Sequence, residues 1–91
     1  MTAIRLVITG RVQGVGFRAF VERHALKRGL RGWVRNRRDG TVETLLIGTD
    51  AILTEIEADC RRGPRLSKVD RVERFLAEDD GAVGFTQRPT L

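Results

Sequence analysis

A glycine-rich segment, Gly10–Arg18, stands where a strand-like run gives way to a helical pattern. Glycines at such a junction allow backbone N–H groups to converge, and the positive end of the helix dipole points the same way. The segment can therefore cradle an anion, to which Arg18 in the first helical turn adds a planar bidentate donor. Because a cation is unfavourable there unless an anion lies nearby, we favour a bound phosphoryl group over a plain turn with a solvated Arg18.

Two other phosphate-binding patterns fit this segment less well. A P-loop would end in Gly-Lys-Ser/Thr, whereas this segment ends in Phe17-Arg18 and offers no hydroxyl for magnesium. The spacing Gly14-x-Gly16-x-x-Ala19 matches a dinucleotide fingerprint, and Asp39 falls near its acidic position. That match is short, the 91-residue chain is too small for the dinucleotide fold, and Asp39 is better used in a hairpin turn.

Few other side chains in the sequence could do chemistry. The motifs contain no Ser, Cys or His nucleophile and no carboxylate pair. The single histidine, His24, borders the apolar stripe of the first predicted helix, and the single cysteine, Cys60, falls on the buried stripe of the second. We expect both to be structural. A lone cysteine allows no internal disulfide and no zinc set, so we expect a reducing compartment, no metal and no cofactor.

Asn36 ends a strand-like run shortly before Asp39-Gly40. At such a strand end, its amide can accept a hydrogen bond from water while donating elsewhere. The structural alternative is a turn residue that precedes the hairpin. Arg37 and Arg38 either form a solvated hairpin tip or steer an anionic substrate, and the sequence leaves both open.

Hydrophobic periodicity predicts seven elements. They are strands over residues 3–9, 30–37, 41–48, 68–77 and 83–88, and helices over 17–28 and 50–62. Gly29 is placed for a left-handed C-terminal cap, and Asp50 is the expected N-cap of the second helix. Asp39-Gly40 predicts a tight hairpin because both positions tolerate positive φ. The last strand should lie at a sheet edge because Pro89 follows it.

The order β-α-β-β-α-β with a short fifth strand predicts an α+β, ferredoxin-like split βαβ fold, with two helices on one face of an antiparallel sheet. In that topology the first and second strands run the same way, with the third antiparallel between them. Gly10–Arg18 and Asn36 should therefore be neighbours at one sheet edge, where sheets of this kind bind ligands.

The charge is distributed unevenly. Residues 1–38 carry ten Lys and Arg and one acid, whereas residues 39–91 carry seven and eleven, so a balance of +9 and one of −4 make up the net charge of +5. The basic part should face an anionic partner. We expect one domain over residues 1–91. No apolar run approaches the ~20 residues of a membrane span, and the chain begins strand-like, not as a signal peptide, which predicts a cytoplasmic protein without a membrane partner.

Two ordered motifs resemble the signatures of the acylphosphatases: Gly10–Arg18, and Gly32–Asn36 followed by Asp39–Glu43. The likeness extends from Ile4 to Arg88. It implies hydrolysis of small-molecule acyl phosphates to carboxylate and inorganic phosphate by a metal-independent enzyme. It also implies that Arg18 binds phosphate and that Asn36 orients the attacking water. The implied phosphate cradle consists of the backbone amides of Gln13, Gly14, Val15, Gly16 and Phe17.

This chemistry suits a site without a nucleophile or metal. The leaving carboxylate is stable without a proton, so a general acid gains little, and phosphoryl transfer depends mainly on positioning and on stabilising phosphoryl charge. We expect a monomer, since nothing in the sequence suggests more.

Two alternatives share the predicted fold. An RNA-recognition module would stack bases on aromatic side chains of the central strands, but residues 4–9 and 41–48 contain no aromatic residue, so we expect no nucleic-acid partner. The other alternative is the acylphosphatase-like domain of a larger maturation factor. Since no zinc-binding cysteines or further domain follow, we favour a free-standing enzyme.

Overall fold

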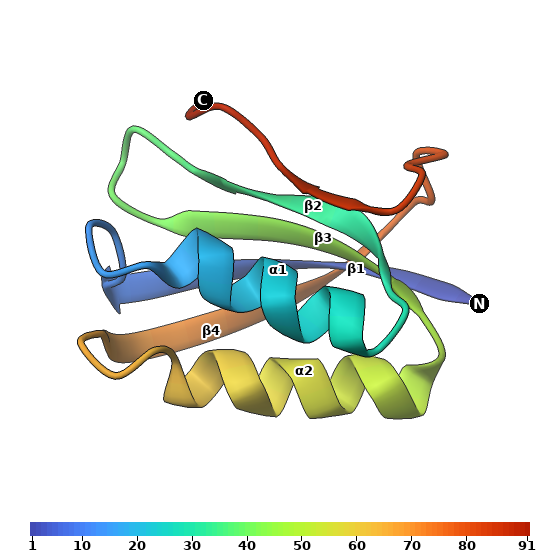
Figure 1. The fold of residues 1–91 in the computed structure, drawn as a ribbon, viewed down its shortest axis with the longest axis horizontal. Coiled ribbons are helices and arrows are strands. Elements are labelled where there is room, and N and C mark those ends of the chain that lie inside the picture. The colour runs from blue at the N-terminus through green and yellow to red at the C-terminus, as the bar shows by residue number, and fades with distance from the viewer.

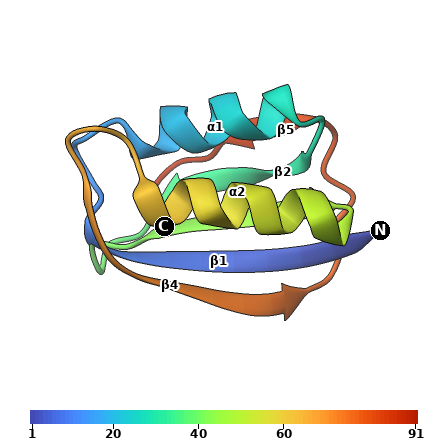
Figure 2. The ribbon, with the colours of Figure 1, turned by 90° about the horizontal axis from the view of Figure 1, so that it is seen from below.

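Two helices cover one face of a five-stranded sheet (Figures 1 and 2). The computed structural model describes residues 1–91. The strands are β1 (Thr2–Arg11), β2 (Arg31–Asn36), β3 (Val42–Gly48), β4 (Lys68–Ala77) and β5 (Phe85–Gln87), and the helices are α1 (Phe17–Lys27) and α2 (Asp50–Arg62). The sheet order β4-β1-β3-β2-β5 confirms the predicted ferredoxin-like arrangement.

The four long strands pair antiparallel, with β3 between β1 and β2 as predicted. The short fifth strand, β5, pairs parallel with β2 at the sheet edge, so the complete sheet is mixed. The reason is the direction of β4, which delivers the chain to the end of the sheet where β2 begins. The short link over residues 78–84 crosses that end, so β5 must run in the same direction as β2.

The ends of the helices follow from their flanking residues. After α1, Gly29 adopts φ 67°, and the N–H groups of Gly29 and Leu30 donate to the carbonyls of Leu26 (3.1 Å) and Ala25 (3.0 Å). This is a Schellman cap, and it confirms the role predicted for Gly29.

The N-cap of α2 is Thr49 and not the expected Asp50. The Thr49 hydroxyl accepts a hydrogen bond from the N–H of Ile52 at 3.4 Å. Asp50 is the first helical residue, where its negative charge is favourable near the positive end of the helix dipole.

The turn between β2 and β3 also differs in detail from the prediction. Only Gly40 has positive φ (91°), and the Asp39 carboxylate accepts hydrogen bonds from the N–H and the hydroxyl of Thr41. The Gly40 N–H donates to the Arg37 carbonyl (3.1 Å), and the Arg37 N–H donates to the Thr41 carbonyl (2.9 Å). The result is a turn followed by a glycine bulge, which is longer than the two-residue turn expected.

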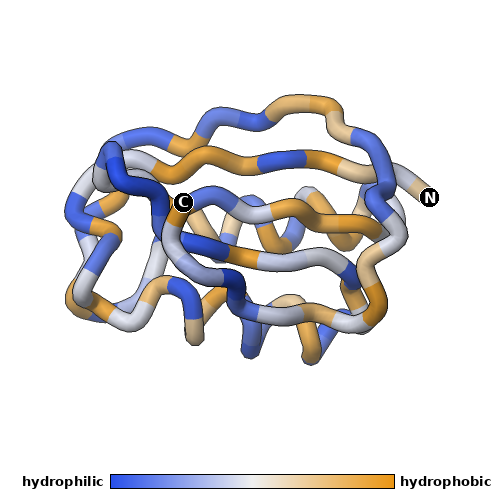
Figure 3. The backbone as a smooth tube through the Cα atoms, turned by 90° about the horizontal axis from the view of Figure 1, so that it is seen from above, coloured by the Kyte–Doolittle hydropathy of each residue, from blue (hydrophilic) through white to orange (hydrophobic).

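The core lies between the helices and the inner face of the sheet. Hydrophobic residues are frequent along the strands (Figure 3), and in β1 the side chains of Ile4, Leu6 and Ile8 are fully buried against the helices. Phe17 and Cys60 join them from α1 and α2. Burial raises the pKa of the Cys60 thiol to about 12, so this side chain is an inert part of the core, as predicted.

Candidate active site

A cavity of about 160 Å³ opens at the end of the sheet where β1 and β2 both finish. Its lining comes from the loop after β1, the first turn of α1 and the ends of β2 and β5. The lining residues are Val12, Gly14, Gly16, Phe17, Arg18, Ala19, Asn36 and Gln87. The predicted juxtaposition of the glycine-rich segment with Asn36 is therefore present.

The backbone of the loop and of the first helical turn presents free donors. Gly14 (φ 72°) and Gly16 (φ 80°) both adopt left-handed conformations, and Gly16 is the N-cap of α1 without any side-chain cap. The first intrahelical bond is donated by the N–H of Phe20 to the Gly16 carbonyl at 3.0 Å. The N–H groups from Gly14 to Ala19 donate to no acceptor in the chain, so they form a set of donors beside the cavity.

Arg18 lies in the first turn of α1, is half-buried and lines the cavity. Its guanidinium forms no ion pair and no hydrogen bond within the chain, and no acidic residue stands in the same turn. The guanidinium and the free amides therefore give the cavity an uncompensated positive field that suits an anion with several oxygen atoms.

Asn36 reaches the cavity because β2 alternates its side chains across the sheet. Val34, two residues earlier, is fully buried on the face covered by the helices, and Asn36 follows on that face. The Asn36 carbonyl accepts from the N–H of Leu91 at 3.1 Å, whereas its side-chain amide has no hydrogen-bond partner in the chain. The amide is thus free to bind water or a ligand.

Gln13 has a contact that the sequence analysis did not anticipate. Its side-chain Nε2 donates to the carbonyls of Arg37 (2.7 Å) and Thr41 (2.9 Å), and it ties the glycine-rich loop to the hairpin that follows Asn36. Gln13 and Val15 were expected in the phosphate cradle, but neither lines the cavity; Val15 is half-buried and packs against the core.

Gln87 is a cavity residue that sequence reasoning missed. It lies at the end of β5, opposite Val34 of β2, and its Nε2 donates to Glu22 Oε1 of α1 at 3.0 Å. Nothing in the sequence pattern marks it, because its position depends on the parallel direction of β5.

Comparison with known proteins identifies the family. The sequence matches the acylphosphatase family model over residues 4–86. The chain belongs to the acylphosphatase family. It is 49% identical over 76 residues to an acylphosphatase from Rhodopseudomonas palustris, covering 84% of this chain and 77% of that protein. It is 44% identical over 90 residues to an acylphosphatase from Acidiphilium cryptum, covering 99% of both.

A solved structure of an acylphosphatase has the same fold. The crystal structure of acylphosphatase from Bacillus subtilis superposes with a TM-score of 0.93 at 39% sequence identity, over 97% of this chain and 99% of that one. This acylphosphatase-family chain is therefore a hydrolase, and its family and fold support acyl phosphate hydrolysis.

The cavity of this acylphosphatase-family chain lies at its basic end. Nine of the seventeen Lys and Arg side chains form ion pairs with carboxylates elsewhere in the molecule. The eight others are Arg11, Arg18, Arg23, Lys27, Arg37, Arg38, Arg65 and Lys68. Six of these eight lie in or beside the three loops around residues 12–16, 37–41 and 63–67, which gather at one end of the molecule (Figures 1 and 2).

His24 lies away from the cavity, between α1 and α2. Its ring packs on Phe20 with 4.4 Å between centroids, and its Nδ1 lies 3.3 Å from Asp59 Oδ2. Arg88 also lies elsewhere, with its guanidinium 4.9 Å from the Trp33 ring centroid. The structure contains no group of three or more His, Cys, Asp and Glu side chains that could hold a metal, and neither helix is long and apolar enough to cross a membrane.

Proposed function

We propose that this protein hydrolyses small-molecule acyl phosphates to a carboxylate and inorganic phosphate in the cavity at the start of α1. In this proposal the amides of residues 13–17 and the guanidinium of Arg18 hold the phosphoryl group, and the Asn36 side chain orients the attacking water. The carrying observation is that Arg18, Asn36 and a set of unpaired backbone N–H groups meet around one cavity of about 160 Å³.

The reaction needs charge stabilisation more than it needs a strong acid or base. Water forms a bond to phosphorus while the bond from phosphorus to the acyl oxygen breaks, and that electron pair leaves with the carboxylate. The equatorial phosphoryl oxygens carry the negative charge through this step. Arg18 and the fixed amide dipoles face those oxygens and need no reorganisation during the reaction, which is the condition under which donors lower a barrier.

Different groups position the attacking water and accept its proton. The Asn36 amide can accept a hydrogen bond from the water and leave its lone pair directed at phosphorus. A phosphoryl oxygen of the substrate accepts the proton as the new bond forms, so that no enzyme base is required. The rate should therefore show no essential enzyme group titrating near neutral pH.

We further propose that the chain acts as a single domain, as a monomer in the cytoplasm, without metal or cofactor. Arg18 and the loop amides supply the positive charge that a metal ion supplies in many phosphoryl-transfer enzymes. We favour hydrolysis over nucleic-acid binding because β1 and β3 carry no aromatic side chain on which a base could stack.

Hydrolysis of benzoyl phosphate in the presence of a chelator tests the proposal. We expect activity in the parent and a loss of about 100- to 1,000-fold in kcat/KM for Arg18→Ala, the range for removing one transition-state donor. Asn36→Ala should lose about 100-fold, because the attacking water is no longer held in position. Arg18→Lys should lie between the parent and Arg18→Ala, because lysine keeps the charge but loses the bidentate geometry.

Lys27→Ala is the matched control for the arginine variant. Lys27 is an unpaired, exposed cation on the same helix but does not line the cavity, so its removal should leave kcat/KM within about twofold. Circular dichroism should show that every variant is folded. Full activity in Asn36→Ala would remove the water-orienting role, and activity abolished by the chelator would contradict metal independence.

A further inference from the structure

A second, larger hollow lies beside the cavity, between α1 and the loop that joins α2 to β4. It has a volume of about 490 Å³. Three arginines line it, together with the ring of Phe20 and the hydroxyl-bearing Ser67. We call this the arginine hollow and define it by Arg23, Arg62, Arg65, Phe20 and Ser67.

The positive charge of the arginine hollow is largely uncompensated. Arg23 and Arg65 form no ion pair in the chain, and no carboxylate lines the hollow. Arg62 has one acidic partner, Asp59 at 3.3 Å, and the Arg62 side chain remains 63% exposed. Three guanidinium groups around one concavity favour an organic anion such as a carboxylate or a phosphate.

The hollow adjoins the cavity along α1. Gly16 and Ala19 border the cavity, and Phe20 and Arg23 border the hollow. Phe20 follows Gly16 by four residues and Arg23 follows Ala19 by four residues, so the two concavities are offset by about 6 Å along the helix axis. This offset is comparable to the distance between the two substituent carbons of a para-disubstituted benzene ring.

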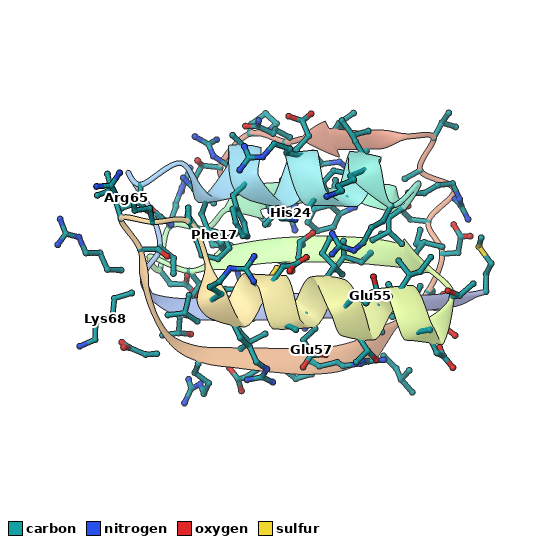
Figure 4. All side chains as sticks on the ribbon, turned by 60° about the horizontal axis from the view of Figure 1, so that its bottom comes forward. Phe17, His24, Glu55, Glu57, Arg65 and Lys68 are labelled. Atoms are coloured by element: carbon teal, nitrogen blue, oxygen red, sulfur yellow. The ribbon has the colours of Figure 1, made fainter.

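Aromatic residues of the two concavities pack on each other. Phe17 of the cavity and Phe20 of the hollow contact each other edge to face, with 5.7 Å between their centroids. Gly63 of the hollow packs so closely on the Phe17 ring that a Cβ there would lie 3.0 Å from Phe17 Cε2. Figure 4 shows Arg65 on the loop after α2, at the end of the molecule where α1 begins.

We propose that the arginine hollow binds a second anionic group on the acyl part of the substrate, so that acyl phosphates bearing a distal carboxylate or phosphate are preferred over neutral ones. This inference rests on the proposed function, because it takes the phosphoryl group to lie in the cavity. The acyl group then extends along α1, and its distal anion lies between Arg23 and Arg65.

A matched pair of substrates tests the inference. Benzoyl phosphate and 4-carboxybenzoyl phosphate differ only in the distal carboxylate. We expect the parent to have a kcat/KM about five- to tenfold higher for the carboxylated substrate, mainly through a lower KM, as two partly exposed charge pairs allow. The double variant Arg23→Gln/Arg65→Gln should lose this preference and keep the parent's kcat/KM for benzoyl phosphate.

The double variant Lys27→Gln/Arg71→Gln separates contact from overall charge. This variant also removes two positive charges, but from positions outside the hollow, so it should retain the parent's preference. Equal preference in the parent and in Arg23→Gln/Arg65→Gln would overturn the inference. So would an equal loss in both double variants, because that would show a long-range effect of net charge.

A binding measurement keeps the test independent of activity. Benzoylphosphonate and 4-carboxybenzoylphosphonate are stable analogues, and their dissociation constants can be measured by NMR titration of the backbone amides. If the parent hydrolyses neither substrate, the proposed function fails. The hollow would still be supported if the carboxylated analogue bound about fivefold more tightly and shifted the amides of Arg65 and Ser67. Equal affinity for the two analogues would overturn it.

Discussion

Arg18 is unfavourable for the unliganded protein and useful for binding. A cation in the first turn of a helix opposes the helix dipole and costs about 0.3–1 kcal/mol. No acidic residue in the first turn of α1 offsets this cost. An anion in the cavity reverses the sign of the interaction, because it is attracted both by the guanidinium and by the free amides.

Position 16 requires glycine because the backbone there is left-handed, and not because a side chain would clash with a neighbour. It has φ 80°, and a Cβ added there would meet nothing within 4 Å. We expect Gly16→Ala to lower the free energy of unfolding by about 1–2 kcal/mol, the cost of holding a side chain in the left-handed region. It should also lower kcat/KM at least tenfold, because relief of that strain redirects the loop amides. Urea unfolding and benzoyl phosphate hydrolysis measure the two effects.

Gly29→Ala provides the control for this prediction. Gly29 has a similar φ of 67°, is equally uncrowded, and ends α1 away from the cavity. Its replacement should cost a similar free energy of unfolding and leave kcat/KM unchanged. If both variants retained activity, the conformation of Gly16 would have no catalytic importance.

The glycine-rich loop and the β2–β3 hairpin are joined by a single side chain. Gln13 donates from one amide nitrogen to two hairpin carbonyls, so removal of this amide breaks two hydrogen bonds between the loop and the hairpin, while each carbonyl keeps its backbone donor. We expect Gln13→Ala to lower the free energy of unfolding by about 1–2 kcal/mol. It should also lower kcat/KM about tenfold, since Asn36 and the loop amides would no longer be held in register.

Thr49→Ala serves as the control for the Gln13 variant. It removes the N-cap of α2, at a similar cost of about 1 kcal/mol, without touching the cavity. The two variants should have similar midpoints of thermal unfolding, and only Gln13→Ala should lose activity. Unchanged kinetics in Gln13→Ala would show that the loop holds its geometry unaided.

The elements could be predicted from the sequence wherever one periodicity dominated. The bounds of α2 and β4 agree with the prediction because clear stop signals follow them, Gly63-Pro64 after α2 and the acidic turn after Ala77. The N-cap of α2 was misplaced by one residue, because Thr49 and Asp50 are both good capping residues and only the backbone conformation separates them. The parallel pairing of β5 depends on the whole sheet and has no local signal.

The candidate site was also predictable in part, namely where the order of the strands determines which residues are neighbours. Arg18 and Asn36 were placed correctly beside each other, because the strand order alone brings their two segments to one sheet edge. The hydrogen bonds of Gln13 and the position of Gln87 depend on side-chain conformation and strand direction. Neither feature produces a periodic pattern in the sequence, so neither could be predicted from it.

Over the whole molecule, charge is separated into neutralised and free regions. The ion pairs lie along the helices and on the sheet, whereas most of the unpaired cations gather at the end that holds the cavity. A field of this kind attracts anions before contact and weakens as salt is added. The net charge of +5 therefore understates the positive charge at the end that holds the cavity.

His24 should make the global stability depend on pH between 7 and 5. Burial lowers its pKa below 6.5, and the repulsion from Arg28, Arg23 and Arg62 adds to this, against the attraction of Asp59. The unfolded chain therefore binds the proton more tightly than the folded one. The free energy of unfolding should fall as the pH drops below 6.5 towards the lowered pKa.

Urea unfolding at a series of pH values measures this effect. His24 is the only histidine, so no other side chain has its ordinary pKa in that range. His24→Gln should unfold with a nearly constant free energy between pH 7 and 5. A parent that gains stability on acidification, or a variant with the parent's slope, would contradict the prediction.

The two helices differ in how they begin. α2 is capped by the side chain of Thr49, whereas α1 begins at a glycine that has no side chain to offer. In the proposed reaction a phosphoryl oxygen takes the place of that missing cap, so the substrate itself completes α1. Hydrolysis and release of phosphate then leave the helix unfinished again, and each turnover is also a cycle of closing and reopening one helix end.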